Sequence, residues 1–419
     1  MTSNYKRLGD FITQVNIRNT DGKITDLRGL SLVKDFRKST SNTVGADMTK
    51  YKVMQQWQFS ANFMGLGVLV DKAAIVLKTD EPPNIVSSAY PVFEVIDHNL
   101  LNPEYLMMWF RRSEFDRYCV FKSDKGIRGG FDWNDLCEVE LPVPPIEKQN
   151  EIVKEYNTIV SRIKLNEKLN ERLEYTAQAL YKHWFVDFEF PNENGQPYKS
   201  SGGEMVYNEE LDQEIPKGWY KGSIGSLSEQ FSGYSFKGDQ YSFEKGITVV
   251  RGENVTEQKL RWDTHKMWDK ELNDRMKKCF LEDLDFVIGM DGSKVGKNWS
   301  LISKHDLPLL LAQRVTCVRA SERDFSLFLY LSLSIYDFER HVSQVQTGTS
   351  VPHISGQQIA DFKFPTPSKT MMPAFQALVE PLFERISLNL NTNAKLENLR
   401  KLLLVKMSKV ESPKTKEVL

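Results

Sequence analysis

The stretch IVKEYNTIVSRIKLNEKLNERLEYTAQALYKHW, residues 152–184, decides the fold. Steps of four and three residues alternate between the positions of one stripe along it, which is the heptad spacing of a coiled coil. The stripe consists of Ile152, Tyr156, Ile159, Ile163, Asn166, Asn170, Leu173, Ala177, Leu180 and Trp184. A long helix with such a stripe predicts a partner helix that covers it.

The same stripe returns 223 residues later without a gap, which indicates an internal repeat. Its members are Phe375, Val379, Leu382, Ile386, Asn389, Asn393, Leu396, Arg400, Leu403 and Met407. A proline pair precedes each stripe, Pro142 and Pro144 before the first and Pro365 and Pro367 before the second. Proline ends a strand and presets the turn into a helix, so each pair marks a helix entry.

The asparagines near the middle of each stripe predict that the two helices meet in Asn–Asn layers. In antiparallel packing Asn166 faces Asn393 and Asn170 faces Asn389, and an Asn–Asn layer fixes a register. Parallel packing also pairs Asn with Asn, so the asparagines alone do not choose. A large domain before each helix favours the antiparallel arrangement. The predicted seam centre comprises Ile163, Asn166, Asn170, Leu173, Ile386, Asn389, Asn393 and Leu396.

Two globular parts of similar size precede the two helices. Short apolar runs such as 67–70, 74–77, 248–250 and 286–288 predict strands, and helical segments such as 103–112 and 325–338 accompany them. The predicted class is α+β: two globular α/β domains separated by two long antiparallel coiled-coil helices, with a pseudo-two-fold repeat. The predicted segments are 1–145 (domain), 146–190 (helix), 191–215 (linker), 216–368 (domain), 369–410 (helix) and 411–419 (tail).

Composition indicates a cytoplasmic protein, and the failure of its candidate catalytic motifs indicates that the chain performs no chemistry. The sequence contains no run of 18 apolar residues, so it predicts no membrane-spanning helix. Its four scattered cysteines lack CxxC spacing and are predicted to be free thiols. GSKVGK at 292–297 lacks the spacing and the Ser or Thr of a phosphate-binding loop. We expect no catalytic residue, no metal and no cofactor. With 55 Lys and Arg against 56 Asp and Glu, bulk charge does not drive DNA binding.

The order of domain, helix, domain, helix resembles the specificity subunits of type I restriction-modification systems. Several phrases support the resemblance in their order and spacing: LPVPPIEKQNEIV at 141–153, ALYKHWFVDFEFP at 179–191, IPKGW at 215–219, DGSKVG at 291–296, LAQRV at 311–315 and QTGTSVPHIS at 346–355. The second helix departs from the EKQ of the first, with SKTMMPAFQ in its place. The resemblance covers nearly the whole chain.

The resemblance implies that each globular part is a target-recognition domain that reads half of a split, asymmetric site in double-stranded DNA. It also implies that the helices set the gap and dock two methyltransferase (modification) subunits, with restriction (motor and nuclease) subunits joining them. From position 152 to 184 a helix rises about 48 Å, and one turn of DNA is about 34–36 Å. Two domains on such a spacer can reach major grooves about one turn apart.

Polar loops with glycine are the candidate DNA contacts, because Arg and amide side chains read base edges and Lys contacts phosphate. The loop at 121–133 of the first domain and the loop at 346–355 of the second lie at the same repeat offset. The candidates are Lys122, Lys125, Arg128, Arg251, Asn254, Ser293, Lys294, Gln313, Arg314, Thr347, Ser350 and His353. A solvated surface loop is the alternative for any single residue among them.

Two other functions are compatible with the sequence. A duplicated coiled-coil adaptor that joins proteins would bind without regard to DNA or salt. A stand-alone modifying enzyme would need a cofactor loop, which the sequence does not show. Both differ from the specificity subunit in what the isolated chain binds or converts.

Overall fold

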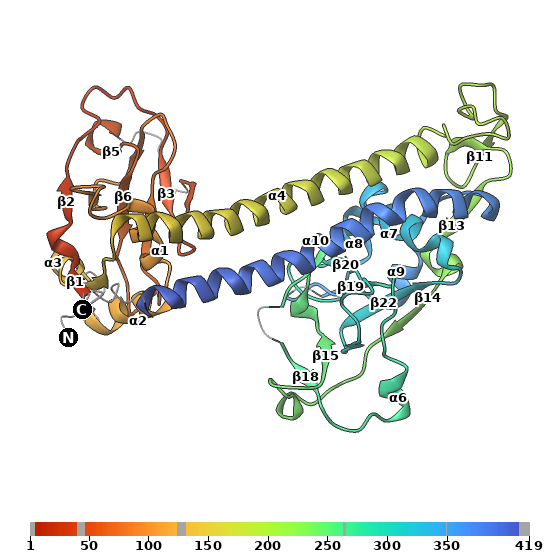
Figure 1. Ribbon diagram of the computed structural model, residues 1–419. Coiled ribbons are helices and arrows are strands. Elements are labelled where there is room, and N and C mark those ends of the chain that lie inside the picture. The colour runs from red at the N-terminus through yellow and green to blue at the C-terminus, as the bar shows by residue number, and fades with distance from the viewer. Residues whose placement is uncertain (1–4, 40–46, 124–130, 263–264, 349, 410–419) are drawn as a thin grey trace, which may run out of the picture. The chain divides into compact units, whose positions relative to one another are not determined.

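The computed structural model describes residues 5–39, 47–123, 131–262, 265–348 and 350–409. The chain mixes helix and strand and divides into two compact units, residues 1–164 with 394–419 and residues 165–393. Two long helices, α4 (Ile146–Phe185) and α10 (Met372–Lys406), contribute to both units (Figure 1). Among the described residues, no helix has the length and apolarity needed to span a membrane.

The first unit is built on an antiparallel four-stranded sheet with the order β2-β9-β6-β7. Its strands are β2 (Ile12–Val15), β6 (Gln58–Asn62), β7 (Ala74–Leu77) and β9 (Val92–Val95). Smaller pairs are formed by β3 (Arg28–Leu30) with β4 (Phe36–Lys38) and by β5 (Lys52–Met54) with β8 (Asn84–Val86). The short helical turns are η1 (Leu8–Asp10) and η2 (Met48–Lys50).

Helix α1 (Pro103–Phe110) forms where the sequence supplies a cap and a preset first turn. The side-chain oxygen of Asn102 accepts the backbone N–H groups of Glu104 and Tyr105, and Pro103 occupies the first helical position. Every residue of α1 except Glu104 is buried, so the helix is part of the core. Helices α2 (Ser113–Lys122) and α3 (Trp133–Cys137) add to the same core.

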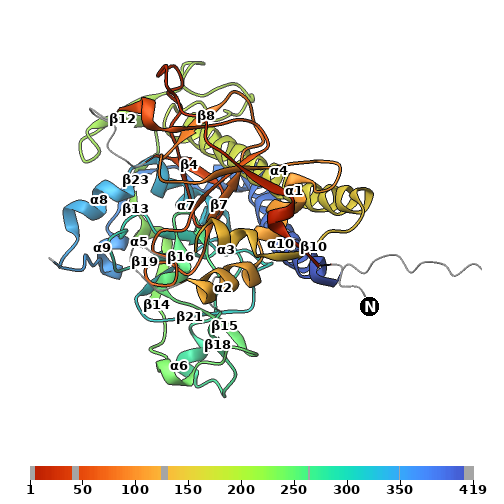
Figure 2. The same ribbon diagram turned by 90° about the vertical axis from the view of Figure 1, so that its left-hand side faces the viewer.

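The first unit also holds the start of α4 and the last turns of α10. Strand β1 (Tyr5–Arg7) pairs antiparallel with β10 (Glu140–Pro142), which leads into α4. The hydroxyl of Tyr5 donates to the carbonyl of Ser408, 3.4 Å away, in the turn η7 (Met407–Lys409). This turn follows α10, and the end of α10 lies beside β10 (Figure 2). The helix entry is therefore tied to both the first strand and the end of α10.

The second unit repeats this plan with the sheet order β14-β22-β19-β20. Its strands are β14 (Ser228–Ser232), β19 (Phe286–Gly289), β20 (Trp299–Leu301) and β22 (Val315–Ala320). Its helices are α5 (Ile224–Leu227), α6 (Asp274–Lys277), α7 (Ser326–Ile335), α8 (Phe338–Val345) and α9 (Gly356–Ala360). Strand β13 (Tyr220–Ser223) pairs with β23 (Lys363–Thr366), as β1 pairs with β10.

Equivalent elements lie at constant offsets in the two units. Leu8 and Ile224 begin the turn before the first sheet strand, 216 positions apart. From β9 onward the offset is 223: β9 begins at Val92 and β22 at Val315. α1 and α7, and α3 and α9, also begin 223 positions apart. The repeat therefore extends through the globular parts, although their sequences align poorly.

The second unit adds elements around the shared plan. The three-stranded sheet β18-β15-β21 consists of β15 (Ile247–Val250), β18 (Met267–Trp268) and β21 (Leu309–Leu311). The pair β16 (Val255–Thr256) and β17 (Lys259–Leu260) and the turns η3 (Gly238–Gln240), η4 (Gly252–Asn254), η5 (Arg323–Phe325) and η6 (Lys369–Met371) complete it. The strands and the turns η3 and η4 lie before β22, in the part of the domain where the two sequences differ in length, whereas η5 and η6 follow it.

Helix α4 ends at Phe185, before residue 190 where the sequence analysis placed its end. Phe188 adopts a left-handed conformation with φ of 61°, and the N–H of Asp187 turns back to the carbonyl of Lys182. The following segment was expected to be a linker, but β11 (Met205–Asn208) and β12 (Gln213–Pro216) form a hairpin in it. Ile215 is fully buried in the second unit's core, which explains why the segment is ordered.

The expected strand at 67–70 is a turn. Gly65 and Gly67 have φ of 72° and 79°, and the N–H groups of Val68 and Leu69 both return to the carbonyl of Gly65. Glycine tolerates these left-handed positions, which end an extended chain. The other expected strands are β7, β15 and β19, and the expected helices are α1, α7 and the start of α8.

Within the second unit, two side-chain hydrogen bonds join α4 to α10. The side-chain nitrogen of Asn166 donates to the oxygen of Asn393, and the nitrogen of Asn389 donates to the oxygen of Asn170, each at 2.7 Å. These are the two pairs that antiparallel packing predicts. Asn166 and Asn389 are buried, so the amides meet away from water.

Candidate nucleic-acid interface

Three segments meet at one end of the second unit's sheet and bring two predicted contact residues to a shared carboxylate. Asp291 follows β19, Arg314 precedes β22, and His353 lies in the loop after α8. Arg314 Nη1 lies 2.9 Å from one Asp291 oxygen, and His353 Nδ1 lies 2.6 Å from the other. Asp291, which the sequence analysis did not single out, is therefore the centre of the cluster.

The backbone holds these segments together. The N–H of Met290 donates to the carbonyl of Arg314, and the N–H of Gly292 donates to the carbonyl of Pro352. Thr347 and His353 exchange backbone hydrogen bonds of 2.9 and 2.8 Å. The positions of Arg314 and His353 are thus fixed by main-chain contacts as well as by Asp291.

The charges of the cluster are arranged so that a cation faces outward. Burial by itself raises the pKa of Asp291, but the hydrogen bonds from His353 and Arg314 outweigh it and hold that pKa below its usual value. The side chain of Asp291 is 18% exposed, whereas that of Arg314 is 70% exposed. A guanidinium held at one edge can offer its other N–H groups to a guanine or a phosphate.

The remaining predicted residues near this cluster are exposed. Ser293, Lys294, Gln313, Thr347 and Ser350 all have exposed side chains. Lys294 Nζ lies 2.8 Å from a carboxylate oxygen of Glu257. An exposed ion pair of this kind contributes little to stability, so Lys294 is available to a stronger anion such as phosphate.

Arg251 and Asn254 do not fit the predicted role as well. Asn254 is 3% exposed, and its amide caps a turn: its oxygen accepts the N–H of Arg251 and its nitrogen donates to the carbonyl of Arg261. The Arg251 guanidinium pairs with Glu253 and lies over the ring of Tyr241. Burial lowers the pKa of Arg251. The amide of Asn254 is occupied by backbone groups, so its predicted contact with DNA is the least supported of the set and stays a prediction.

In the first unit, Lys122 is exposed on the last turn of α2, with its ammonium 6.0 Å from the ring centre of Tyr118. Lys125 and Arg128 lie outside the described residues. A hollow lies near the end of this unit's sheet, and no motif in the sequence indicates it. Its lining includes Gln14, Lys52 and Asn62. The offsets of 216 and 223 do not locate it, and only the strand pairing shows that Asn62 has the place of Asp291, 229 positions later.

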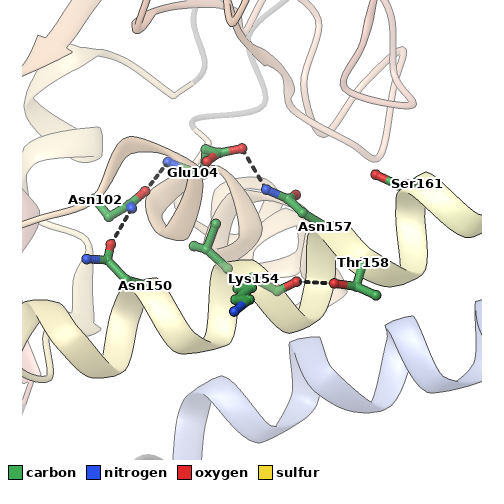
Figure 3. A pocket seen from close by; sticks show the side chains of 8 residues that line it. Asn102, Glu104, Asn150, Lys154, Asn157, Thr158 and Ser161 are labelled. Carbon is green, nitrogen blue, oxygen red and sulfur yellow. Dashed lines mark hydrogen bonds between the residues drawn. The ribbon is translucent and has the colours of Figure 1, made fainter.

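A second polar pocket of the first unit lies where α1 starts beside α4 (Figure 3). Asn102 donates from its side chain to Asn150 at 2.8 Å, and Asn157 donates to Glu104 at 2.9 Å. Figure 3 shows these side chains pointing toward one another in pairs. Because the pocket's amides and carboxylate are engaged with each other, the pocket serves to join the domain to its helix.

The described residues contain no cluster of His, Cys, Asp and Glu suited to a metal ion. All four cysteines are free thiols, and burial raises the pKa of both Cys119 and Cys317. The thiolate is the reactive form. Buried thiols with raised pKa values are therefore poor nucleophiles.

The chain is similar in sequence to known specificity subunits. It is 26% identical over 313 residues to the type I restriction enzyme MjaIX specificity subunit of Methanocaldococcus jannaschii, covering 73% of this chain and 68% of that protein. It is 23% identical over 375 residues to the HindI specificity subunit of Haemophilus influenzae, covering 77% and 80%. No family model matches the chain.

Its fold also matches a solved structure, the S subunit of a type I restriction-modification system from M. genitalium. The TM-score is 0.55 at 13% identity, and the match covers 97% of this chain and 96% of that one. The duplicated fold and the sequence relatives together define a class of subunits that serve restriction and modification. Within that class, the sequence relatives support a specificity subunit of a type I restriction-modification system, and the fold agrees with it.

Proposed function

We propose that this chain reads a split, asymmetric DNA sequence, one half with each globular domain, and that it carries subunits which perform the chemistry. The observation that carries the proposal is the repeated sheet order, β2-β9-β6-β7 and β14-β22-β19-β20, each followed by a long helix. Two domains of one design but different surfaces suit two half-sites of different sequence. We propose the domain limits predicted from the sequence with one change: residues 191–215, predicted as a linker, are assigned to the second domain.

The Arg314 cluster supports DNA reading by the second domain. Arg314 is exposed and held in place by Asp291, and Lys294 and Ser293 lie in the loop that follows Asp291. Arginine reads guanine through two parallel hydrogen bonds in the major groove, and lysine neutralises phosphate. An arginine fixed by its neighbours loses little side-chain entropy when it binds.

Helices α4 and α10 act in this proposal as an antiparallel coiled coil that sets the gap between half-sites. The 40 residues of α4 correspond to about 60 Å of helix. The two Asn–Asn contacts penalise a shifted register, because a shift leaves buried amides without partners. A fixed register gives a fixed gap length.

The modification subunits, two of them in the proposed complex, dock on the helices, and the restriction subunits join through them. Apolar side chains on both helices are left uncovered by the chain itself: Leu165, Leu169, Leu388, Leu390, Leu399, Leu402 and Val405. In the first unit, Ile159, Leu399, Leu402 and Val405 line an apolar hollow of about 690 Å³ between α4 and α10. Exposed apolar clusters of this kind mark protein interfaces. The proposed complex works in the cytoplasm, and this chain contributes no catalytic group or cofactor.

The experiment is to produce the chain with its modification subunit and to map methylated bases in DNA that the complex has treated. We expect methylation within one two-part sequence with a constant gap. Replacing residues 216–368 with the corresponding domain of another specificity subunit should change one half of that sequence only. Methylation without sequence preference, or stable complexes that ignore DNA, would favour the adaptor function instead.

A further inference from the structure

The hollow of the first domain lies at the place in the fold that the Arg314 cluster occupies in the second. Val92 and Val315 are 223 positions apart and face Ser60 and Gly289, respectively, across the sheet. Asn62 therefore corresponds to Asp291, and Pro91 corresponds to Arg314. The backbone agrees, because the N–H of Ala61 donates to the carbonyl of Pro91 at 3.1 Å, as Met290 does to Arg314.

The chemistry at this place differs between the two domains. The first domain has a proline where the second has its exposed arginine, so no guanidinium enters the hollow from that position. A cation comes instead from β5, where Lys52 Nζ lies 2.8 Å from the carbonyl of Tyr90. Burial lowers the pKa of Lys52. The hollow encloses about 320 Å³, and Trp133 forms one of its walls.

Asn62 and Gln14 line the hollow in different states. The Asn62 oxygen accepts the N–H of Met64 at 3.0 Å, and its nitrogen lies 3.4 Å from the Tyr90 hydroxyl. Asn62 is therefore held in place. Gln14 is exposed on β2, and within the described part of the chain its amide makes no hydrogen bond. A free amide at the mouth of a hollow is suited to binding a partner with one donor and one acceptor.

The equivalent glutamine of the second domain is used internally. Gln230 is 216 positions after Gln14, and its amide nitrogen donates to the carbonyl of Ser228 at 2.8 Å and to its hydroxyl at 2.6 Å. The two domains have thus exchanged roles at two positions. At these two positions the second domain exposes Arg314, and the amide of its Gln230 is hydrogen-bonded within the domain. The first domain exposes Gln14 and has Pro91 in place of the arginine.

We propose that Gln14 determines specificity in the first half-site by reading adenine, with Lys52 contacting a nearby phosphate. A glutamine amide matches the N6 and N7 groups of adenine in the major groove, whereas arginine matches guanine. The two half-sites then differ in the base read at equivalent places of the two domains. This inference rests on the proposed DNA-reading function.

The test uses the complex of the full chain with its modification subunit and a panel of duplexes that vary each base pair of the site. The first half-site is the one left unchanged when residues 216–368 are replaced. Gln14→Ala should reduce the preference for adenine at one position of that half-site by roughly 5- to 150-fold. The second half-site and the gap should stay the same. Lys52→Ala should weaken all duplexes alike and lower the salt dependence by about one ion.

Thr13→Ala is the matched control, because Thr13 is the exposed neighbour of Gln14 on β2 and points to the opposite face. It should leave every preference unchanged. An unaltered adenine preference in Gln14→Ala would overturn the inference while the proposed function stands. If the complex with the unchanged chain prefers no two-part sequence, the proposed function fails and this inference falls with it.

Discussion

The side-chain nitrogen of Asn166 donates a 2.7 Å hydrogen bond to the side-chain oxygen of Asn393, 227 positions later in the chain. Asn389 donates in the same way to Asn170. In each pair one asparagine comes from α4 and the other from α10. The two contacts fix the register of the helices within the second unit at the level of single residues, which hydrophobic contacts do less sharply.

Removing one member of a pair should destabilise the chain more than removing both. Asn166→Leu removes the N–H group that donates to the side-chain oxygen of buried Asn393, which costs about 1–3 kcal/mol. The double substitution Asn166→Leu with Asn393→Leu should restore most of this loss. Urea unfolding of the two single variants and the double variant measures the difference. Additive losses would contradict a pairwise contact.

The carboxylate of Asp291 should make stability depend on pH in one direction. Its pKa is below the usual value, so its contribution is present above the unfolded-state pKa of about 3.9 and is lost as pH falls through the lower folded-state pKa. Asp291→Asn should lower the free energy of unfolding at pH 7, and the difference from the unchanged chain should shrink below about pH 4. Urea unfolding between pH 3 and 8 measures it.

Asp274→Asn provides the control for that series, because the Asp274 side chain is 96% exposed. It should change stability little at any pH. A constant deficit for Asp291→Asn down to pH 3 would show that the carboxylate's charge is not what stabilises the cluster.

Arg314→Lys should keep the charge of the second domain but lose the planar pair of donors. We expect discrimination at one base pair of the second half-site to fall by roughly 5- to 150-fold, with little change in salt dependence. Binding titrations of the complex with duplexes altered in that half-site measure this. Lys304→Ala is the control, because it removes a cation of the same domain that pairs with Glu384 on α10 and is not a predicted DNA contact. Equal discrimination by all three proteins would exclude a base contact by Arg314.

A matched insertion in both helices should lengthen the gap without changing either half-site. Seven residues are placed between Ile163 and Lys164 and seven between Lys395 and Leu396, which face each other in the register of the asparagine pairs. One heptad keeps the seam in phase and adds about 10 Å, or roughly three base pairs. Methylation mapping gives the new gap. Recognition of the old gap would contradict the role of the helices as a spacer.

The helices could be predicted from sequence because their information is local and periodic. The asparagines of the two stripes lie 223 residues apart in sequence, and this spacing predicts the pairs Asn166–Asn393 and Asn170–Asn389 once the domain before each helix favours antiparallel packing. The strand order was not predictable in the same way. Strands such as β6 and β9 are short and joined by long segments, and their pairing depends on the core that both help to form.

The candidate site was predictable only in part. Exposed residues in glycine-bearing loops, such as Arg314, could be selected by residue type. The amide of Asn254 looks equally suitable in the sequence, but the structure gives it to the backbone of Arg251 and Arg261. Gln14 lies in a strand rather than a loop, so no local feature indicates it. The role that we propose for Gln14 follows only from a comparison of the two domains position by position.

The asparagine contacts have a consequence for how such a chain can arise. Asn393 is the repeat copy of Asn170, and Asn389 is the repeat copy of Asn166. Asn166 therefore contacts the copy of Asn170, and Asn170 contacts the copy of Asn166. An isologous interface follows the same rule. Two separate copies of one half could therefore associate through the same contacts, and under the proposed function such a pair would read a palindrome. Under that function, fusion of two such genes frees each half to diverge, and exchange of one half by recombination creates a new target in a single event.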